Sequence, residues 1–176
     1  DRTDLSFILL TPPLGYLKRW RARNSRIHRL MQSIVHLDIH IGHFMERLRV
    51  GFDLVQVSGI ANSLHQFGAA FEARLFTDGE LEYARSGTGQ FAERLAARFA
   101  AKEATIKALQ LGNEGVSWCD IEVRKLLDGD CVLVLHGKVA KLAAQLHIEQ
   151  LAVSLSHDGD YAGAFVTVLC RAQGND

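Results

Sequence analysis

Long apolar runs, metal-type cysteine spacing and net charge are all missing from this chain of 176 residues. No stretch approaches the roughly 20 apolar residues of a membrane-spanning helix, and residues 7–10 are too short for a signal core. The three cysteines, Cys119, Cys131 and Cys170, are isolated and show no zinc-type or disulfide-framework spacing. We therefore expect one globular domain that does not enter a membrane, with reduced cysteines in its core.

A helix is predicted over residues 98–109, and it carries a carboxylate where an apolar residue is expected. Phe99 and Ile106 mark its inward stripe, and Glu103 falls on that stripe, one turn before Lys107. A charge buried without a partner costs several kcal/mol, so an inward Glu103 must be paired or bind a metal. The alternative is a solvated Glu–Lys pair four residues apart, worth about 0.2–0.5 kcal/mol.

A second acidic residue lies in the apolar segment 50–57, which is typical of a buried strand. Strand alternation places Asp53 on the same face as Val55, and Gly51 leaves room for a close backbone approach. The alternative for Asp53 is an acidic residue that caps a turn at the end of the strand.

A polar strand end follows near the C-terminus, where Ser154 and Ser156 share one face of a predicted strand and His157 comes next. A second strand, residues 163–170, completes a hairpin. Hydroxyls and an imidazole at one strand end can hold phosphate oxygens. The alternative is an ordinary polar edge with a histidine in its turn.

Together these segments resemble the holo-acyl-carrier-protein synthases, the small 4′-phosphopantetheinyl transferases, over about residues 47–170. The family's hallmark helix, Arg-Phe-Ala-Ala-Lys-Glu-Ala-x-x-Lys-Ala, is matched at every fixed position by residues 98–108. Its other motifs occur in order as Gly51-Phe52-Asp53, residues 74–81, Trp118-Cys119-Asp120-Ile121-Glu122-Val123 and residues 154–157.

The resemblance implies transfer of the 4′-phosphopantetheine arm of coenzyme A to a serine of an apo acyl carrier protein, with release of adenosine 3′,5′-bisphosphate. It implies Asp53 and Glu103 as ligands of Mg²⁺, and Lys107 as a catalytic residue that binds phosphate oxygens. Arg98, Ser156 and His157 would contact coenzyme A. Phosphoryl transfer of this kind depends mainly on positioning and charge neutralisation, which suits these residue types.

Several roles stay open at this point. Glu103, a water on the metal or His157 could accept the proton of the carrier serine. Lys102 could extend a basic rim or be solvated. Asp158 could orient His157 or form a turn.

The resemblance has one departure of consequence. The family's helix after the first strand commonly carries arginines that dock an acidic carrier protein, but residues 58–73 contain no Lys or Arg, and Gly59 occupies a common arginine position. Arg74 does match a basic position of the family. We therefore leave the carrier open between a fatty-acid and a specialised one, such as a polyketide carrier.

Residues 1–44 hold seven Lys and Arg against three acidic residues, mostly in a run at 18–29. The resemblance begins after them, so we expect Met45 to be the natural start, residues 1–44 to be an extension and residues 45–176 to be the transferase domain. The alternative is a genuine basic arm for an acidic partner, such as nucleic acid. A metal pair at His36 and His40 is a further, weaker possibility.

The pattern predicts an α+β fold in which an antiparallel sheet packs against the long motif helix. The expected strands span 49–57, 118–126 and 131–136, with a final hairpin at 150–170. The expected helices span 58–70, a short stretch from a Thr77–Glu80 capping box, 90–111 and 138–146. The resemblance also implies a cytoplasmic homotrimer with active sites between subunits. A non-catalytic module that binds coenzyme A or a carrier is the alternative function.

Overall fold

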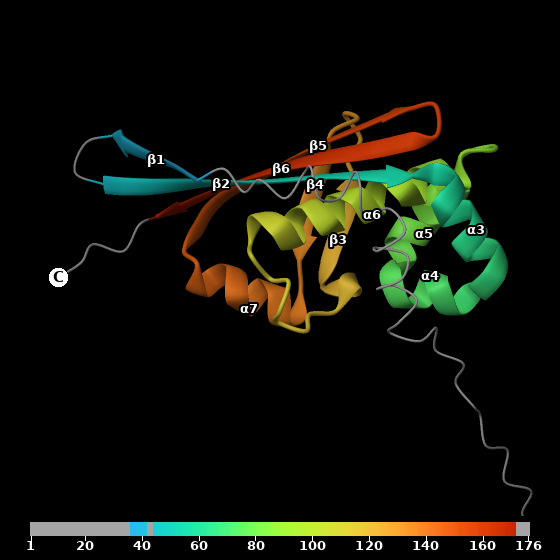
Figure 1. Cartoon of the computed structure of the whole chain (residues 1–176), viewed down its shortest axis with the longest axis horizontal. Helices are drawn as coiled ribbons and strands as arrows, with labels where there is room; N and C mark the ends of the chain where they lie inside the picture. Colours follow the sequence, from blue (N-terminus) through green and yellow to red (C-terminus); the bar gives the residue numbers. More distant parts are fainter. Residues whose placement is uncertain (1–35, 42–43, 172–176) are drawn as a thin grey trace, which may run out of the picture.

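The computed structural model describes residues 36–41 and 44–171 and has the expected α+β architecture (Figure 1). A four-stranded antiparallel sheet has the order β1-β2-β6-β5, and β3 pairs with β4 in a separate hairpin. The strands are β1 (His36–Ile41), β2 (Phe44–Gln56), β3 (Ile121–Lys125), β4 (Cys131–Leu135), β5 (Ile148–Asp158) and β6 (Tyr161–Arg171). The helices are α3 (Val57–Phe67), α4 (Ala69–Leu75), α5 (Asp78–Arg85), α6 (Phe91–Ala108), α7 (Gly137–Gln145) and the 3₁₀ turn η1 (Trp118–Asp120).

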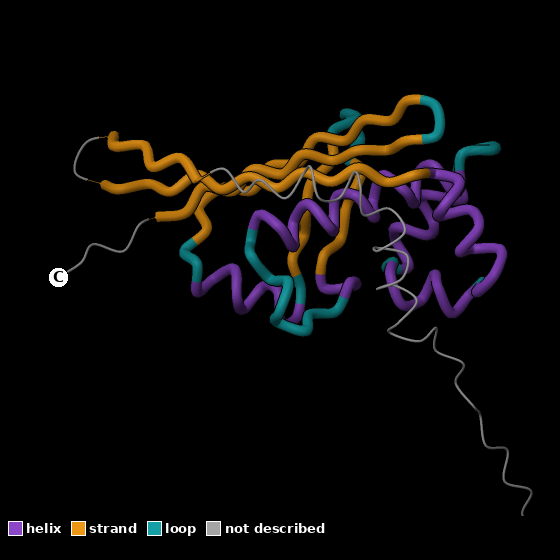
Figure 2. Tube along the Cα trace, viewed as in Figure 1, coloured by secondary structure: helices purple, strands orange, loops and turns teal. Residues whose placement is uncertain are grey.

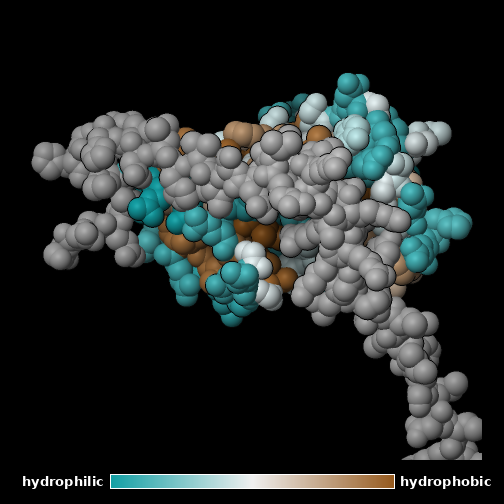
Figure 3. Space-filling model, in the orientation of Figure 1, coloured by the Kyte–Doolittle hydropathy of each residue, from teal (hydrophilic) through white to brown (hydrophobic). Residues whose placement is uncertain are grey.

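The helices lie on one side of the sheet, with α6 along it, α3 to α5 at one end and α7 toward the other (Figure 2). Alternation along β6 turns small and branched residues toward α6: Ala162, Ala164, Val166 and Val168 are all buried. The same view in space-filling form shows hydrophobic residues reaching the surface between α6 and α7 (Figure 3). Among the described helices, none is long and apolar enough to cross a membrane.

Helix α6 is the centre of the fold and packs very closely on β2. A Cβ atom added to Gly51 would lie 1.9 Å from the carbonyl oxygen of Ala104 and 2.9 Å from the nitrogen of Ala108. Any side chain there would clash with helix backbone, which cannot move locally, so Gly51 is required by the close approach. This confirms the role predicted for Gly51 and fixes the register between β2 and α6.

The predicted helix over 58–70 is wrong in its extent, because the structure divides this region into α3 and α4. Gly68 lies between them with φ 50°, a left-handed conformation that ends a helix, and its N–H donates to the Leu64 carbonyl. The capping box at the start of α5 is confirmed: Glu80 N–H donates to the Thr77 hydroxyl, and Thr77 N–H donates to the Glu80 carboxylate.

The predicted strand at 118–126 is also shorter than expected. Residues 118–120 form η1, started by the Ser117 hydroxyl, which accepts a hydrogen bond from the Cys119 N–H. The predicted strand at 49–57 is present as β2, which begins five residues earlier than expected, and the remaining predicted elements shift by one to three residues at their ends. Cys170 is buried as expected, whereas Cys119 and Cys131 are half-buried and are not full core residues.

Part of the N-terminal region belongs to the sheet, since β1 pairs with β2 from His36 opposite Arg49 to Ile41 opposite Phe44. His36 and His40 both lie in β1, where residues four apart are separated by about 13 Å along the strand, so the helical spacing on which the predicted metal pair relies is absent. The basic run at 18–29 lies outside the described residues. The division of the chain at residue 45 stays a prediction.

Candidate active site

The two predicted metal-binding carboxylates come from β2 and α6, the pair of elements that Gly51 brings into contact. Asp53 is 6% exposed and shares the inward face of β2 with Gly51 and Val55, as strand alternation predicts. Glu103 is 2% exposed on the buried side of α6. Both carboxylates are therefore inward-facing, which confirms the first interpretation of each segment over its surface alternative.

Lys107 joins these groups. Its Nζ lies 2.8 Å from Asp53 Oδ1 and donates a second hydrogen bond to the Phe52 carbonyl at 2.9 Å. Glu103 precedes Lys107 by one helical turn, so their side chains leave α6 on the same face. The structure thus pairs Asp53 with Lys107 at the contact between β2 and α6, and Glu103 lies one helical turn before Lys107 on α6.

This donor set has the chemistry of a site for a hard divalent cation. Carboxylate oxygens are the ligands that Mg²⁺ prefers, and two of them leave room for water and substrate oxygens. Within residues 36–41 and 44–171 there is no cluster of three or more metal-ligating side chains. The residues therefore fit a metal shared with a substrate rather than one enclosed by protein.

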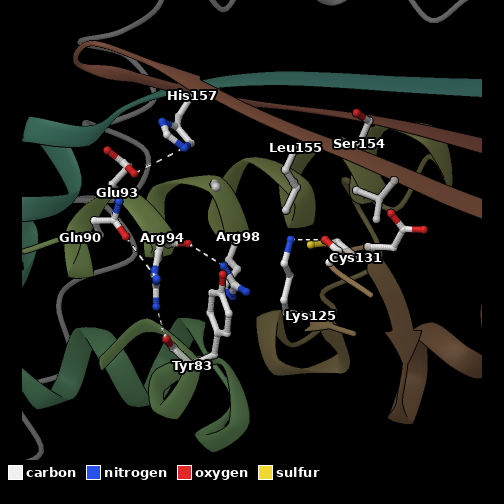
Figure 4. A pocket seen from close by; sticks show the side chains of 14 residues that line it. Tyr83, Gln90, Glu93, Arg94, Arg98, Lys125, Cys131, Ser154, Leu155 and His157 are labelled. Carbon is white, nitrogen blue, oxygen red and sulfur yellow. Dashed lines mark hydrogen bonds and ion pairs between the residues drawn. The ribbon is translucent and has the colours of Figure 1, made fainter. Parts of the chain in front are cut away.

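A cavity of about 370 Å³ lies along the first half of α6, between α5, β5 and the β3–β4 hairpin (Figure 4). Four cationic or ionisable basic side chains line it, Arg94, Arg98, Lys125 and His157, against the acidic Glu93 and Asp130. The other lining residues are Tyr83, Gln90, Ala97, Gly129, Cys131, Val153, Ser154 and Leu155. The surplus of basic groups makes the cavity suitable for an anionic ligand.

Arg98 is the most buried cation of the cavity, at 3% exposed. Its guanidinium lies 4.0 Å from the centre of the Tyr83 ring, and Nη1 donates to the Arg94 carbonyl at 3.1 Å. Its Nε and Nη2 have no hydrogen-bond partner among the described residues. Burial lowers the pKa of Arg98, and the nearby Tyr83 partly opposes this. A buried guanidinium with unused donors is typical of an anion site.

Tyr83 also contacts Arg94, whose guanidinium lies 4.7 Å from the ring centre and donates to the Tyr83 carbonyl at 2.9 Å. One aromatic residue therefore positions two guanidinium groups that would otherwise repel each other. Tyr83 was not among the predicted site residues, because nothing in the spacing from 83 to 98 indicates that α5 and α6 place these residues together.

His157 stands at the edge of the cavity, with Nε2 3.5 Å from Glu93 Oε1 (Figure 4). Glu93, rather than the neighbouring Asp158, is the acidic residue recorded beside this imidazole. Glu93 was also missed, since an acidic residue in the first turn of a helix is ordinary. Ser156 is exposed and does not line the cavity, although Ser154, two residues before it on β5, does.

The turn after His157 is tied to the start of α3. Asp160 accepts hydrogen bonds from the Ser58 N–H at 2.7 Å and from the Ser58 hydroxyl at 2.6 Å. These bonds lower the pKa of the Asp160 carboxyl. They anchor the β5–β6 turn and therefore the strand end that carries His157.

Lys102 corrects the sequence analysis, which placed it on a basic rim or in solvent. Its side chain is fully buried, and Nζ lies 2.8 Å from Glu80 Oε2. It also donates to the Trp118 carbonyl at 3.0 Å and to the Ile121 carbonyl at 2.6 Å. Burial lowers the pKa of Lys102, and Glu80 partly opposes that effect. Lys102 is therefore a structural residue.

Comparison with known proteins agrees with this geometry. The family profile described as the 4′-phosphopantetheinyl transferase superfamily matches residues 49–166. The chain belongs to this family. The match includes every site residue discussed above, and it confirms the resemblance on which the sequence analysis relied.

Curated relatives carry the name holo-[acyl-carrier-protein] synthase. The one from Gloeobacter violaceus is 40% identical over 121 residues, covering 69% of this chain and 92% of the relative. The one from Koribacter versatilis is 42% identical over 120 residues, covering 68% and 95%. Holo-[acyl-carrier-protein] synthases are transferases. The chain is therefore a transferase, and this conclusion rests on its family as well as on its fold.

Solved structures give the same result. An apo-ACPS structure from Chronobacterium ammoniagenes is 37% identical, with a TM-score of 0.65 over 72% of this chain and 99% of that one. An ACPS–CoA complex from the same organism has 37% identity and a TM-score of 0.63 over 72% and 98%. The α+β fold predicted from the sequence is therefore confirmed by both the topology and its solved neighbours.

Proposed function

We propose that this chain moves 4′-phosphopantetheine from coenzyme A to a serine of an apo acyl carrier protein and releases adenosine 3′,5′-bisphosphate. The observation that carries the proposal is the convergence of Asp53, Glu103 and Lys107 in a member of the phosphopantetheinyl transferase family. A relative is solved as a complex with CoA, which supports coenzyme A as the donor.

Asp53 and Glu103 would hold Mg²⁺ through oxygen atoms. When bound, the ion would neutralise the pyrophosphate of coenzyme A and favour in-line attack. Lys107 pairs with Asp53 at 2.8 Å and retains a third N–H beyond its two recorded contacts. It would use that donor for a phosphate oxygen and stabilise the charge that develops on the leaving group.

The cavity beside α6 would take an anionic part of coenzyme A. Arg98 and His157 line it, and Arg98 offers buried N–H groups without partners among the described residues. Ser156 lies between two residues that line the cavity, Leu155 and His157, but does not line it itself, so its proposed contact with coenzyme A would be made outside the cavity.

We propose a homotrimer with sites between subunits, as in the family resemblance. The face of the sheet opposite α6 supports an interface, since it has no covering element within the described ranges and carries Phe165, 44% exposed, and Tyr161, 40% exposed. Light scattering of the purified chain would test the trimer, and a monomer with full activity would contradict it.

We also propose that residues 45–176 are the transferase domain and that the chain acts in the cytoplasm. A chain that begins at Met45 should retain transfer activity, because the proposed site residues all lie in β2, α6 and β5. The comparison of its turnover with that of the full chain tests the boundary. A large loss would show that β1 contributes more than an edge strand.

The decisive experiment is intact mass spectrometry of a panel of apo carrier proteins after incubation with this chain, coenzyme A and magnesium. A panel is needed because the exposed positions of α3, including Ala61, Asn62, His65 and Gln66, contain no Lys or Arg. A gain of one phosphopantetheine that a chelator blocks is the expected result. Binding of coenzyme A without transfer to any carrier would instead favour the non-catalytic module.

A further inference from the structure

Cys131 places a thiol inside the cavity that the basic side chains line. It is the first residue of β4, is half-buried and pairs in register with Lys125 across the hairpin. Both side chains line the cavity, and Lys125 Nζ donates to the Gly129 carbonyl (Figure 4). The proposed transfer reaction has no use for this thiol.

A second feature of the same cavity indicates an anionic ligand. Only 3% of the surface of Arg98 is exposed, and its Nε and Nη2 have no hydrogen-bond partner among the described residues. Arg98 and Cys131 line the same cavity. Arg94, Lys125 and His157 line the same space. Reactive cysteines occupy partly exposed, electropositive surroundings of this kind.

The other two cysteines lack this environment. Cys119 directs its Sγ toward the carbonyls of Ala73, Arg74 and Phe76 at 3.5–3.8 Å, and burial raises the pKa of its thiol. Cys170 is 3% exposed, and burial raises its pKa as well. A raised pKa leaves less thiolate, so both residues serve as slow internal references for Cys131.

We propose that Cys131 is a modification site for small anionic disulfides, whose carboxylates the cavity cations recognise. The Cys131 thiol loses its proton to solvent, and the thiolate sulfur attacks one sulfur of the disulfide. The new S–S bond joins Cys131 to one half of the reagent, and the other half leaves as a thiolate. Cys131 is oxidised, the departing half is reduced, and no other reactant is needed.

This modification would regulate the enzyme. The bound half would place its carboxylate among Arg98 and Lys125 and fill the cavity, so coenzyme A would be excluded until a thiol reductant removes it. This consequence rests on the proposed function, whereas the reactivity of Cys131 does not.

The first test compares two disulfide reagents on the full chain, dithiobis(nitrobenzoate), which is dianionic, and dithiodipyridine, which is neutral. Peptide mapping by mass spectrometry follows each cysteine over time. We expect the dianionic reagent to label Cys131 about tenfold or more faster than Cys119 or Cys170, with a preference that falls at high salt. Equal rates at the three cysteines, or no preference for the anionic reagent, would overturn the proposal.

The second test changes the charge without touching the thiol. Lys125→Gln should slow the dianionic reagent several-fold and leave the neutral one unchanged. Lys141→Gln, an exposed lysine of α7, is the matched control and should alter neither rate. An equal slowing of both reagents by Lys125→Gln would mean that the hairpin was disturbed, and would remove the charge argument.

The third test separates this proposal from the proposed function. Coenzyme A should protect Cys131 from labelling. After treatment with the dianionic reagent, the wild type should keep only part of its earlier transfer activity, whereas Cys131→Ser should keep nearly all of its own. Fast, charge-dependent labelling without protection by coenzyme A would uphold the modification site and refute its regulatory effect. No fast labelling, with transfer intact, would refute the site and leave the proposed function standing.

Discussion

Two lysines of the same helix, Lys102 and Lys107, each lie 2.8 Å from a carboxylate, yet their surroundings differ. The Lys102–Glu80 pair is completely buried, with 0% side-chain exposure on both partners. The Lys107–Asp53 pair retains 16% and 9%. From the sequence, Lys107 is expected to bind phosphate oxygens, whereas Lys102 is left open between a basic rim and solvent.

Hydrogen-bond capacity explains the difference. Lys102 uses all three N–H groups, on Glu80, the Trp118 carbonyl and the Ile121 carbonyl. Glu80 in turn accepts from the Thr77 and Val123 N–H groups. This closed network ties α5, α6 and β3 together. Lys107 has spare capacity and an opening to solvent, which are what a substrate phosphate needs.

The largest effect should come from breaking the closed network. Lys102→Met leaves the Glu80 carboxylate and two backbone carbonyls buried without their donor, so we expect the free energy of unfolding to fall by about 3–5 kcal/mol. Lys107→Met is the matched comparison and should lose less, about 1–3 kcal/mol, because water can reach the Asp53 carboxylate through the partial opening of this pair. Urea unfolding of both variants checks this, and equal losses would erase the distinction.

Replacing either proposed metal ligand, Asp53 or Glu103, should lower the transfer activity and leave the fold intact. Asp53→Ala and Glu103→Ala should each lower metal-dependent transfer by more than about a hundredfold, because each removes one proposed metal ligand. Their circular dichroism spectra should remain those of the folded chain. Glu82→Ala, an exposed position on α5, is the control. Wild-type rates in either carboxylate variant would refute the metal assignment.

Lys107→Ala should have a smaller effect on transfer than either carboxylate variant. We expect kcat to fall by about tenfold to a hundredfold and the KM for coenzyme A to change less, because Lys107 stabilises charge that develops during the reaction. Steady-state kinetics against coenzyme A would separate the two constants. A raised KM with unchanged kcat would make Lys107 a binding residue only.

The carboxylate of Glu122, on the β3–β4 hairpin, should give the smallest of the expected effects on stability. Hydrogen bonds from Arg124 at 2.9 and 3.0 Å, followed by one with His136, hold the pKa of Glu122 below its ordinary value of 4.5. The folded chain therefore binds fewer protons than the unfolded chain. This contribution to stability is complete above about pH 4.5 and is lost as the pH falls through the lowered pKa.

Urea unfolding between about pH 3 and 6 should show that loss as a shallow slope, because the Arg124 side chain is 53% exposed and solvent weakens its pair with Glu122. Glu122→Gln should reduce the slope, and Glu82→Gln should leave it intact. A slope that is the same in all three proteins would assign the acid sensitivity to other groups.

The sequence by itself determined the family, the α+β fold and the inward direction of Asp53 and Glu103. The family followed from ordered motifs that resemble those of the 4′-phosphopantetheinyl transferases, and the fold class from the order of the predicted elements. The local features followed from short-range rules, namely strand alternation around Asp53, helical period around Glu103, the missing Cβ of Gly51 and the capping box at Thr77. Each depends on residues within a few positions of one another, so a linear pattern contains the information.

Only the tertiary structure decided which charges are structural and which are available. Helical period shows that Lys102 leaves one face of α6, but the groups that meet it, Glu80 and the Ile121 carbonyl, lie about 20 residues away on either side. The same holds for the cavity, where Tyr83, Cys131 and His157 come from three elements. Burial and partner geometry are properties of packed elements, and no spacing along the chain encodes them.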